Sequence, residues 1–205
     1  MNVFVVDEDP CLAARALGDR HVVKMVLESA QIMCTVASRL GHVVPYRPTH
    51  VNHPCVVWAR ESAGNWRWLV AHARALAVEY EFRYGRRHKS LDVIDEVAKL
   101  GPRAPGFGPW ARAMPVAYHL ASVVDSYRLY YHMDKGHLHD YEHGRRRPEW
   151  LPPRRGRLFE DARSWTRDVE GLRRHKIKEF EDNLRRAERI FGAVGRWDYG
   201  RSRRI

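Results

Sequence analysis

The side chains best suited to chemistry lie in the stretch GDRHVVKMVLESAQ, residues 18–31. At about 100° per residue, a helix here brings five polar side chains into one sector roughly 80° wide: His21, Lys24, Glu28, Gln31 and Thr35. His21 and Glu28 form a titratable pair two turns apart, which proton transfer or stabilisation of a developing cation requires. The solvated face of an ordinary surface helix has the same pattern, so helical geometry alone leaves both interpretations open.

A second polar group lies in YRPTHVNHPCVVWARESAGN, residues 46–65. Its loop ends where Pro54 opens a helix, and the helix dipole would join the imidazole and amide groups in attracting an anionic or polar ligand. We expect this group to line the substrate site through Tyr46, His50, Asn52, His53, Glu61 and Asn65. A structural capping and packing role is the alternative.

The same loop raises the question of a metal. His50, His53 and Cys55 could supply three zinc ligands, but no second CxxC or HxxxH half accompanies them in the sequence. The strand pattern and metal-binding residues of an HNH nuclease are also missing from the sequence. We therefore expect neither a metal nor another cofactor.

The charge of the chain favours a polyanionic partner. It has 36 Lys and Arg against 25 Asp and Glu, a net charge of +11. Residues 154–205 alone carry 16 Lys and Arg against 9 Asp and Glu, so a basic C-terminal extension holds most of the excess. Counterion release would make its binding to DNA strong at low salt and insensitive to sequence, whereas a solvated helix with a basic bias is the alternative.

Contacts to DNA phosphates are expected from basic residues spread along the chain, namely Arg60, Arg83, Lys89, Arg145, Arg146 and Arg147. Trp150 follows the arginine run, and an aromatic ring in that setting can lie on a nucleic-acid backbone or stack on a base. The other clustered aromatics recur at near-helical steps and are predicted to be mainly core: Trp58, Trp66, Trp68, Tyr127, Tyr130 and Tyr131.

Hydrophobic spacing predicts a mainly α protein, with a compact helical domain over residues 1–153 and a basic helical extension over residues 154–205. NVFVVDEDP, residues 2–10, is predicted to form one short strand or extended segment. Further helices are predicted at about residues 12–40, 54–85, 90–101 and 115–134, with Gly, Pro or Ser at their ends.

The sequence offers no signal for a membrane or an oxidising compartment. It contains neither a signal-peptide pattern nor an apolar run of the roughly 18 residues that a membrane span needs. Its 3 cysteines are an odd and sparse set, which argues against a disulfide framework. A soluble cytoplasmic protein is expected, in a bacterial host cell if a phage encodes it, and the oligomeric state is left open.

Three motifs resemble one known family. LGDRHVVKMVLESAQ, with Leu-x-Asp-x-His and a glutamate seven residues after the histidine, resembles the first helix of the pyrimidine-dimer DNA glycosylases, which include the phage repair enzyme endonuclease V and its bacterial relatives. THVNHPCVVW resembles the His-Pro segment of the bacterial relatives, and RRRPEW resembles their Arg-Pro-x-Trp near the C-terminus. The similarity covers about residues 12–151.

The resemblance implies a compact all-α enzyme that binds and bends duplex DNA, extrudes a nucleotide and acts at a glycosidic carbon. It implies that Glu28 is the catalytic glutamate and His21 the active-site histidine, and we expect Lys24 beside them to take part. Double-stranded DNA is the expected partner. The leading interpretation is therefore a glycosylase-like enzyme that processes a pyrimidine base.

Two departures from the family keep other functions open. The family's nucleophile is the α-amine of an N-terminal threonine that forms a Schiff base, whereas this chain starts Met1-Asn2, and methionine before asparagine is poorly removed. Two arginines that flank the family's glutamate are replaced by Leu27 and Gln31. One alternative is a phage DNA hypermodification transferase that adds an amino acid or amine to an activated hydroxymethyluracil base. Another is a non-enzymatic DNA-binding accessory protein.

Overall fold

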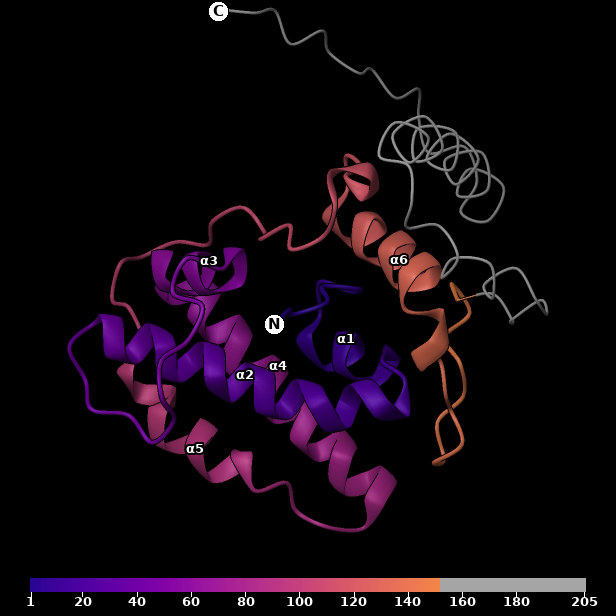
Figure 1. Ribbon diagram of the computed structural model, residues 1–205, viewed down its shortest axis with the longest axis horizontal. Helices are drawn as coiled ribbons and strands as arrows, with labels where there is room; N and C mark the ends of the chain where they lie inside the picture. Colours follow the sequence, from indigo (N-terminus) through magenta and orange to yellow (C-terminus); the bar gives the residue numbers. More distant parts are fainter. Residues whose placement is uncertain (152–205) are drawn as a thin grey trace, which may run out of the picture. The chain divides into compact units, whose positions relative to one another are not determined.

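The computed structural model describes residues 1–151, which are built from helices (Figure 1). The α-helices in that part are α1 (Pro10–Ala16), α2 (Asp19–Arg39), α3 (Pro54–Glu61), α4 (Ala63–Tyr84), α5 (Ser90–Val97) and α6 (Val123–Asp134). Short 3-10 helices follow at η1 (Ala98–Leu100), η2 (Val116–Tyr118) and η3 (Gly136–Leu138). Residues 1–151 contain no β-strand, so the prediction of a mainly α protein is confirmed.

The chain divides into two compact units, Met1–Pro148 and Glu149–Ile205. The predicted helical extension, residues 154–205, lies outside the described residues, and its boundary stays a prediction. None of the helices in the described part is long and apolar enough to cross a membrane.

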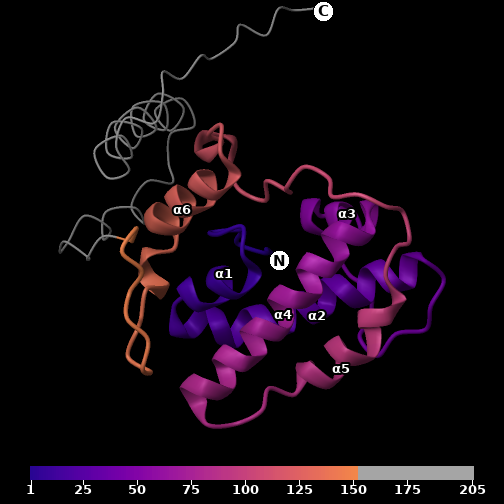
Figure 2. The ribbon, with the colours of Figure 1, turned by 180° about the vertical axis from the view of Figure 1, so that it is seen from behind.

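Helix α2 organises the first unit. It packs against α3, α4 and α5, and α1 packs against α4 (Figures 1 and 2). Its buried face carries apolar side chains at helical spacing, including Val22, Met25, Val26, Met33 and Val36. The polar stripe lies beside this apolar face, and its members His21, Glu28 and Thr35 are buried as well, so the fold fixes which way the stripe points.

The first long predicted helix, residues 12–40, is interrupted at Leu17 and Gly18. A side chain at Gly18 would collide with the carbonyl oxygen of Leu138, because a distant segment passes close by. The backbone N–H of Asp19 donates to the carbonyl of Asp140 at 2.8 Å. A contact with a segment over 100 residues away therefore sets the start of α2.

The second long predicted helix, residues 54–85, is likewise two helices that meet at Ser62. Ser62 has an extended backbone, and its hydroxyl accepts the N–H of Asn65 at 3.2 Å as the N-cap of α4. Gly64 donates its N–H to the carbonyl of Gly106 at 3.0 Å, and a side chain at Gly64 would clash with that oxygen. The break lets the loop around Gly106 lie against the start of α4.

The N-terminal segment is buried and extended, but it forms no strand. Its polar groups are used locally: the side-chain oxygen of Asn2 accepts the N–H groups of Val3 at 2.7 Å and Phe4 at 3.2 Å, and Val6 donates its N–H to the Phe4 carbonyl at 2.7 Å. Phe4 has a φ of +48°, a left-handed conformation that costs about 1–3 kcal/mol at a non-glycine residue. Tertiary contacts must therefore hold this segment in place.

Candidate active site

Glu28 lies where the N-terminal segment meets α2. One carboxylate oxygen, Oε2, accepts the backbone N–H of Asn2 at 3.0 Å and is 3.8 Å from the α-amine of Met1. The other, Oε1, is 3.2 Å from Nζ of Lys24. The Glu28 side chain is 11% exposed, whereas that of Lys24 is 66% exposed. A nearly buried carboxylate thus touches two amines and a backbone donor.

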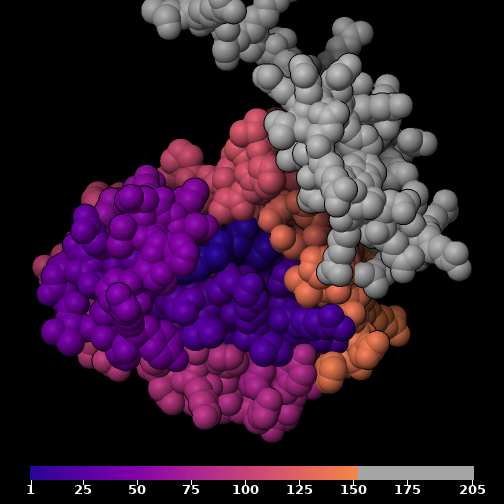
Figure 3. Space-filling view, in the orientation of Figure 1, coloured from indigo at the N-terminus to yellow at the C-terminus, as the bar shows by residue number. Residues whose placement is uncertain are grey.

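The surface is hollowed at this place. Figure 3 shows the indigo N-terminal segment at the floor of a hollow, with α3 on one side, α6 on the other and α2 below. Glu28 accepts the N–H of Asn2 in that segment, so the carboxylate contacts the segment that forms the floor. Such a concave site that ends in a carboxylate and amines can receive a polar group.

The floor is anchored by a loop far along the chain. The side-chain amide of Asn2 donates to the carbonyl of Ala113 at 2.7 Å. Tyr127 on α6 then fixes that loop, because its hydroxyl accepts the N–H of Ala113 at 3.2 Å and donates to the carbonyl of Ala111 at 3.0 Å. The position of the amine beside Glu28 therefore depends on residues more than 100 positions away.

His21 is buried beneath the N-terminal segment and contacts it, so its ring is not exposed to solvent. Its Nδ1 is 2.8 Å from the hydroxyl of Tyr131, and its ring centroid is 4.9 Å from that of Phe4. Burial, with the nearby charges of Lys135 and His139, lowers the pKa of His21 to about 3. The neutral ring suits a positioning role for Phe4, and the predicted catalytic role of His21 stays a prediction.

The loop before α3 brings one of its predicted residues to the site. His53 caps α3 by accepting the N–H of Cys55 at 3.2 Å. Burial lowers the pKa of His53, and so does the α-amine at the start of the chain, while Glu28 and a backbone contact with Met1 act in the opposite direction. The charges of the α-amine and of Glu28 therefore both reach His53.

Other residues of the polar group lie apart from Glu28. His50 and Asn52 are exposed on the same loop, where His50 Nδ1 is 2.7 Å from the Thr49 hydroxyl. The hydroxyl of Tyr46 is 3.1 Å from that of Ser90 at the start of α5. Glu61 is exposed at the end of α3.

The side chain of Asn65, which was expected at the substrate site, binds only backbone groups inside the protein. Its side chain is completely buried, donates to the carbonyl of Trp58 at 2.7 Å and accepts the N–H of Gly108 at 2.9 Å. These bonds fix the loop that follows Gly106 against α3 and α4. No surface of this amide is open for a ligand.

Thr35, the last member of the polar stripe, ties the loop to α2. Its hydroxyl donates to the carbonyl of Gln31 at 2.8 Å, lies 3.1 Å from the carbonyl of Thr49 and accepts the N–H of Thr49 at 3.1 Å. Within the polar stripe, His21 contacts the N-terminal segment, Glu28 contacts the amines, and Thr35 binds the loop before α3.

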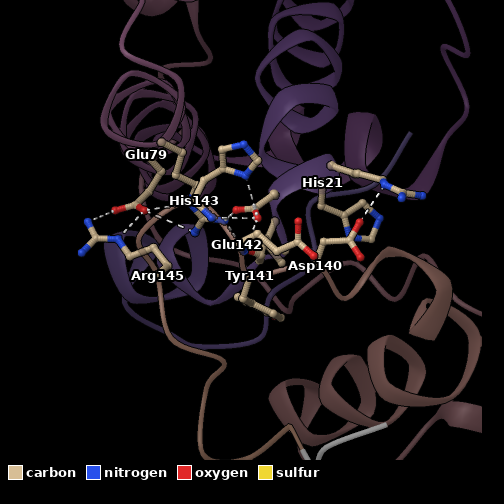
Figure 4. A network of polar contacts seen from close by, with 12 residues as sticks. His21, Glu79, Asp140, Tyr141, Glu142, His143 and Arg145 are labelled. Atoms are coloured by element: carbon tan, nitrogen blue, oxygen red, sulfur yellow. Dashed lines mark hydrogen bonds and ion pairs between the residues drawn. The ribbon is translucent and has the colours of Figure 1, made fainter. Parts of the chain in front are cut away.

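Two arginines that were expected at DNA phosphates belong to an internal network (Figure 4). The Arg83 side chain is completely buried and donates to Asp19 at 3.0 Å and to Glu79 at 3.3 Å, as well as to two backbone carbonyls. Arg145 donates to both oxygens of Glu79, at 2.8 and 2.7 Å, and its guanidinium lies 3.9 Å from the Phe82 ring. Arg83 is therefore corrected from a phosphate contact to a core residue.

Asp19 is the other end of this network. Its Oδ2 accepts the N–H of Glu142 at 2.7 Å and is 3.1 Å from Nδ1 of His143. Burial by itself would raise the pKa of Asp19, but the Glu142 N–H, His143 and Arg83 outweigh it and hold the pKa below 3.8. The network locks the first turn of α2 to α4 and to residues 142–145, and so orients the polar stripe.

The remaining basic candidates have different surroundings. Arg60 is half-buried, and Lys89 and Arg146 are exposed, as a phosphate contact requires. A guanidinium nitrogen of Arg147 donates to the carbonyl of His139 at 3.4 Å. Trp150 belongs to the second unit and is half-buried.

The zinc alternative conflicts with the state of its sulfur ligand. Cys55 is fully buried, and burial raises the pKa of its thiol to about 12, so the thiolate that zinc needs is disfavoured. Within residues 1–151, no three His, Cys, Asp or Glu side chains are grouped closely enough to hold a metal ion.

Residues 1–92 match the family model of the pyrimidine dimer DNA glycosylases. No curated protein and no solved structure matches the chain. The suspected resemblance is confirmed over this range, which includes Glu28 and the whole of α2, and it indicates a DNA glycosylase-like enzyme with DNA as its substrate. The RRRPEW motif and α6 lie outside the matched residues.

Several residues at the site were not predicted there from the sequence. Asn2, Phe4 and Tyr131 were read as a strand and as core, yet they position the amine and His21. An apolar segment that starts directly after the first methionine and lacks a pairing strand was the available signal. The left-handed Phe4 could not be recognised from residue types.

Proposed function

We propose that this protein excises a pyrimidine base from duplex DNA, using an amine at the start of the chain as nucleophile and Glu28 as its acid/base partner. The observation that carries the proposal is that the Met1 α-amine and the Asn2 backbone nitrogen lie 3.8 and 3.0 Å from one oxygen of Glu28. The similarity of residues 1–92 to pyrimidine dimer DNA glycosylases supports the same chemistry.

The reaction joins the amine to the sugar. The amine nitrogen attacks the anomeric carbon, the glycosidic bond breaks, and the base leaves with the bonding electrons and takes up a proton. Glu28 accepts the proton that the amine loses, and its negative charge stabilises the positive charge that develops at the sugar. Opening of the sugar ring then gives an imine between the protein and the former anomeric carbon.

The α-amine is a better candidate than Lys24, although Lys24 also reaches Glu28. Amines at chain termini lose their proton at lower pH than lysine side chains, so more of them are nucleophilic near neutrality. If Met1 is removed, the new α-amine is the Asn2 nitrogen that already donates to Glu28. If Met1 is retained, its own amine lies slightly farther from the same oxygen.

The anomeric carbon of a stacked nucleotide cannot reach a carboxylate at the floor of a hollow. Duplex DNA must therefore present the nucleotide in an extruded or strongly bent form. His53 on one side and Lys24 on another border the position that the sugar would take. This arrangement favours action on an exposed nucleotide over action inside the helix stack.

Borohydride trapping tests the proposal directly. The protein is incubated with duplex DNA that contains a pyrimidine dimer or an abasic site, sodium borohydride is added, and the adduct is mapped by peptide mass spectrometry. A sugar remnant on the first residue of the mature chain is expected. A remnant on Lys24 alone would reassign the nucleophile, and the absence of any adduct would overturn the imine.

Nucleoside mass spectrometry of the treated DNA separates the alternatives. A pyrimidine that is freed once the dimer is reversed by light supports base excision, because the broken glycosidic bond leaves it joined only to its neighbouring base, whereas an enlarged base would support a transferase. Unchanged nucleosides despite tight DNA binding would indicate an accessory protein. Glu28→Gln serves as the inactive control, because it keeps the size of the side chain and removes its charge.

A further inference from the structure

Lys135 follows the last turn of α6, the helix on one side of the hollow, and lies outside the residues that match the glycosylase family. It is the C-cap of α6, where its N–H donates to the carbonyl of Tyr131 at 3.2 Å. Its Nζ lies 4.8 Å from the ring centroid of Tyr130. The ammonium group is therefore held against α6 by an aromatic face.

A stack of rings connects this ammonium group to the catalytic helix. The Tyr130 ring stacks on Phe4 at 6.0 Å with an angle of 9° between the planes, and Phe4 contacts His21 at 4.9 Å. Lys135 is also the charged side chain that most depresses the pKa of His21, ahead of Lys24 and His137. The charges of Lys135, Lys24 and His137 all reach the His21 ring.

The charge of Lys135 is not neutralised by its neighbours. Within residues 1–151 it forms no ion pair with a carboxylate. The nearby acids have other partners: Asp134 accepts the Tyr118 hydroxyl at 2.6 Å, Asp140 pairs with Arg20 at 2.7 Å, and Glu28 pairs with Lys24. Lys135 is therefore a cation whose charge no carboxylate of residues 1–151 neutralises in an ion pair, whereas Lys24 already pairs with Glu28.

We propose that Lys135, with Lys24 and His137, binds a backbone phosphate of the DNA strand whose nucleotide enters the hollow. The inference rests on the proposed function for the identity of the strand, and it assigns to α6 the second wall of the DNA site. A phosphodiester suits these groups, because an ammonium is a point charge that contacts phosphate oxygens without demanding a fixed geometry. The contact positions the strand and carries no information about its bases.

The salt dependence of DNA binding tests this assignment. The affinity of the full chain for an undamaged fluorescent duplex is measured by anisotropy over a range of KCl concentrations, for the wild type, Lys135→Gln and Lys135→Arg. The slope of log K against log salt should become shallower by about 0.9 in Lys135→Gln, as expected for one lost phosphate contact, and should be kept in Lys135→Arg. Lys99→Gln, at an exposed lysine of η1, is the matched control and should keep the slope.

An unchanged slope in Lys135→Gln would overturn the proposal, and so would an equal loss in Lys135→Arg. The Tm is also measured with and without inorganic phosphate. If phosphate raises the Tm of the wild type but not of Lys135→Gln, while the salt slope of DNA binding is the same in both, Lys135 belongs to a free-phosphate site and the proposal is wrong. Base release at saturating DNA is measured separately for the wild type and Lys99→Gln, and the two rates should be equal. Absence of base release from the wild type would contradict only the proposed function, since the slope is measured on undamaged DNA.

Discussion

Asp19 and Glu28 are carboxylates on the same helix, and their surroundings give them different roles. Asp19 is enclosed by Arg83, His143 and the N–H of Glu142, each fixed by the fold. Glu28 instead faces a free α-amine and the largely exposed Lys24 at the floor of a hollow. A buried acid whose partners are all structural stabilises the fold, whereas one whose partners are amines near solvent can exchange protons with a substrate.

The largest effect is expected from Glu28→Gln. Loss of an acid/base group that acts in the transition state costs about 10²–10⁴ in rate, and single-turnover base release measures it. Thermal stability should change little, because the Asn2 N–H can still donate to the amide oxygen. Wild-type base release by Glu28→Gln would contradict the role of Glu28.

Asp19→Asn should show the opposite behaviour. It leaves the charge of Arg83 buried with one carboxylate fewer, and breaking a buried ion pair costs about 3–5 kcal/mol of folding free energy. Urea unfolding measures the loss, and the base-release rate per folded molecule should stay near the wild-type value.

Arg20→Ala is the matched control for Asp19→Asn. The Arg20–Asp140 pair is on the surface, with the Arg20 side chain 66% exposed, so its loss should cost less than about 1 kcal/mol. A comparable loss in both variants would mean that the buried network contributes no more than a surface pair. A slowed rate in fully folded Asp19→Asn would instead connect Asp19 to the chemistry.

The contrast between the two acids marks what the sequence could predict. The motif with a glutamate seven residues after a histidine predicts Glu28 as the catalytic residue, because helical spacing and residue type are local information, and this role stays a prediction. Nothing local distinguishes Arg83, which is buried, from Arg60, which is not. Only the approach of Asp19 and Glu79 in the folded chain decides which arginine lies in the core.

The fold shows the same division. Hydrophobic periodicity predicted the helical segments, but both long predicted helices are broken, at Gly18 and at Ser62. The first break depends on the segment at Leu138 and the second on the loop at Gly106. Periodicity reports the buried face of a helix and is insensitive to a distant backbone that passes across it.

Acid should weaken the fold in two pH windows that overlap only below pH 3.8. Burial lowers the pKa of His21 to about 3 and that of His72 to about 4, both below the ordinary 6.5. Between these values the unfolded chain binds more protons, so stability falls below pH 6.5 by up to about 1.4 kcal/mol per pH unit for each histidine. The pKa of Asp19 lies below 3.8, so its contribution is lost only at still lower pH.

His72→Asn separates the contributions. The His72 ring nitrogen Nδ1 lies 3.0 Å from the carbonyl of Pro10, and an asparagine amide can donate to the same oxygen. Between pH 6.5 and 4, the slope of the unfolding free energy against pH should fall by about 1.4 kcal/mol per pH unit, the contribution of one proton. Urea titrations at several pH values measure it. An unchanged slope would mean that His72 is protonated alike in the folded and unfolded chain.

The smallest effect is expected from Thr35→Val, which removes a tether between the polar stripe and the loop of His53. Valine has nearly the same shape, but the hydrogen bonds to Thr49 are lost, at a cost of about 1 kcal/mol in unfolding free energy. Because Thr35 touches neither the amine nor Glu28, the rate at saturating DNA should be kept, while the affinity for DNA should fall as the loop loosens. A reduced saturating rate with unchanged affinity would place Thr35 with Glu28 in the chemistry, and the stripe would then act as one catalytic unit along its whole length.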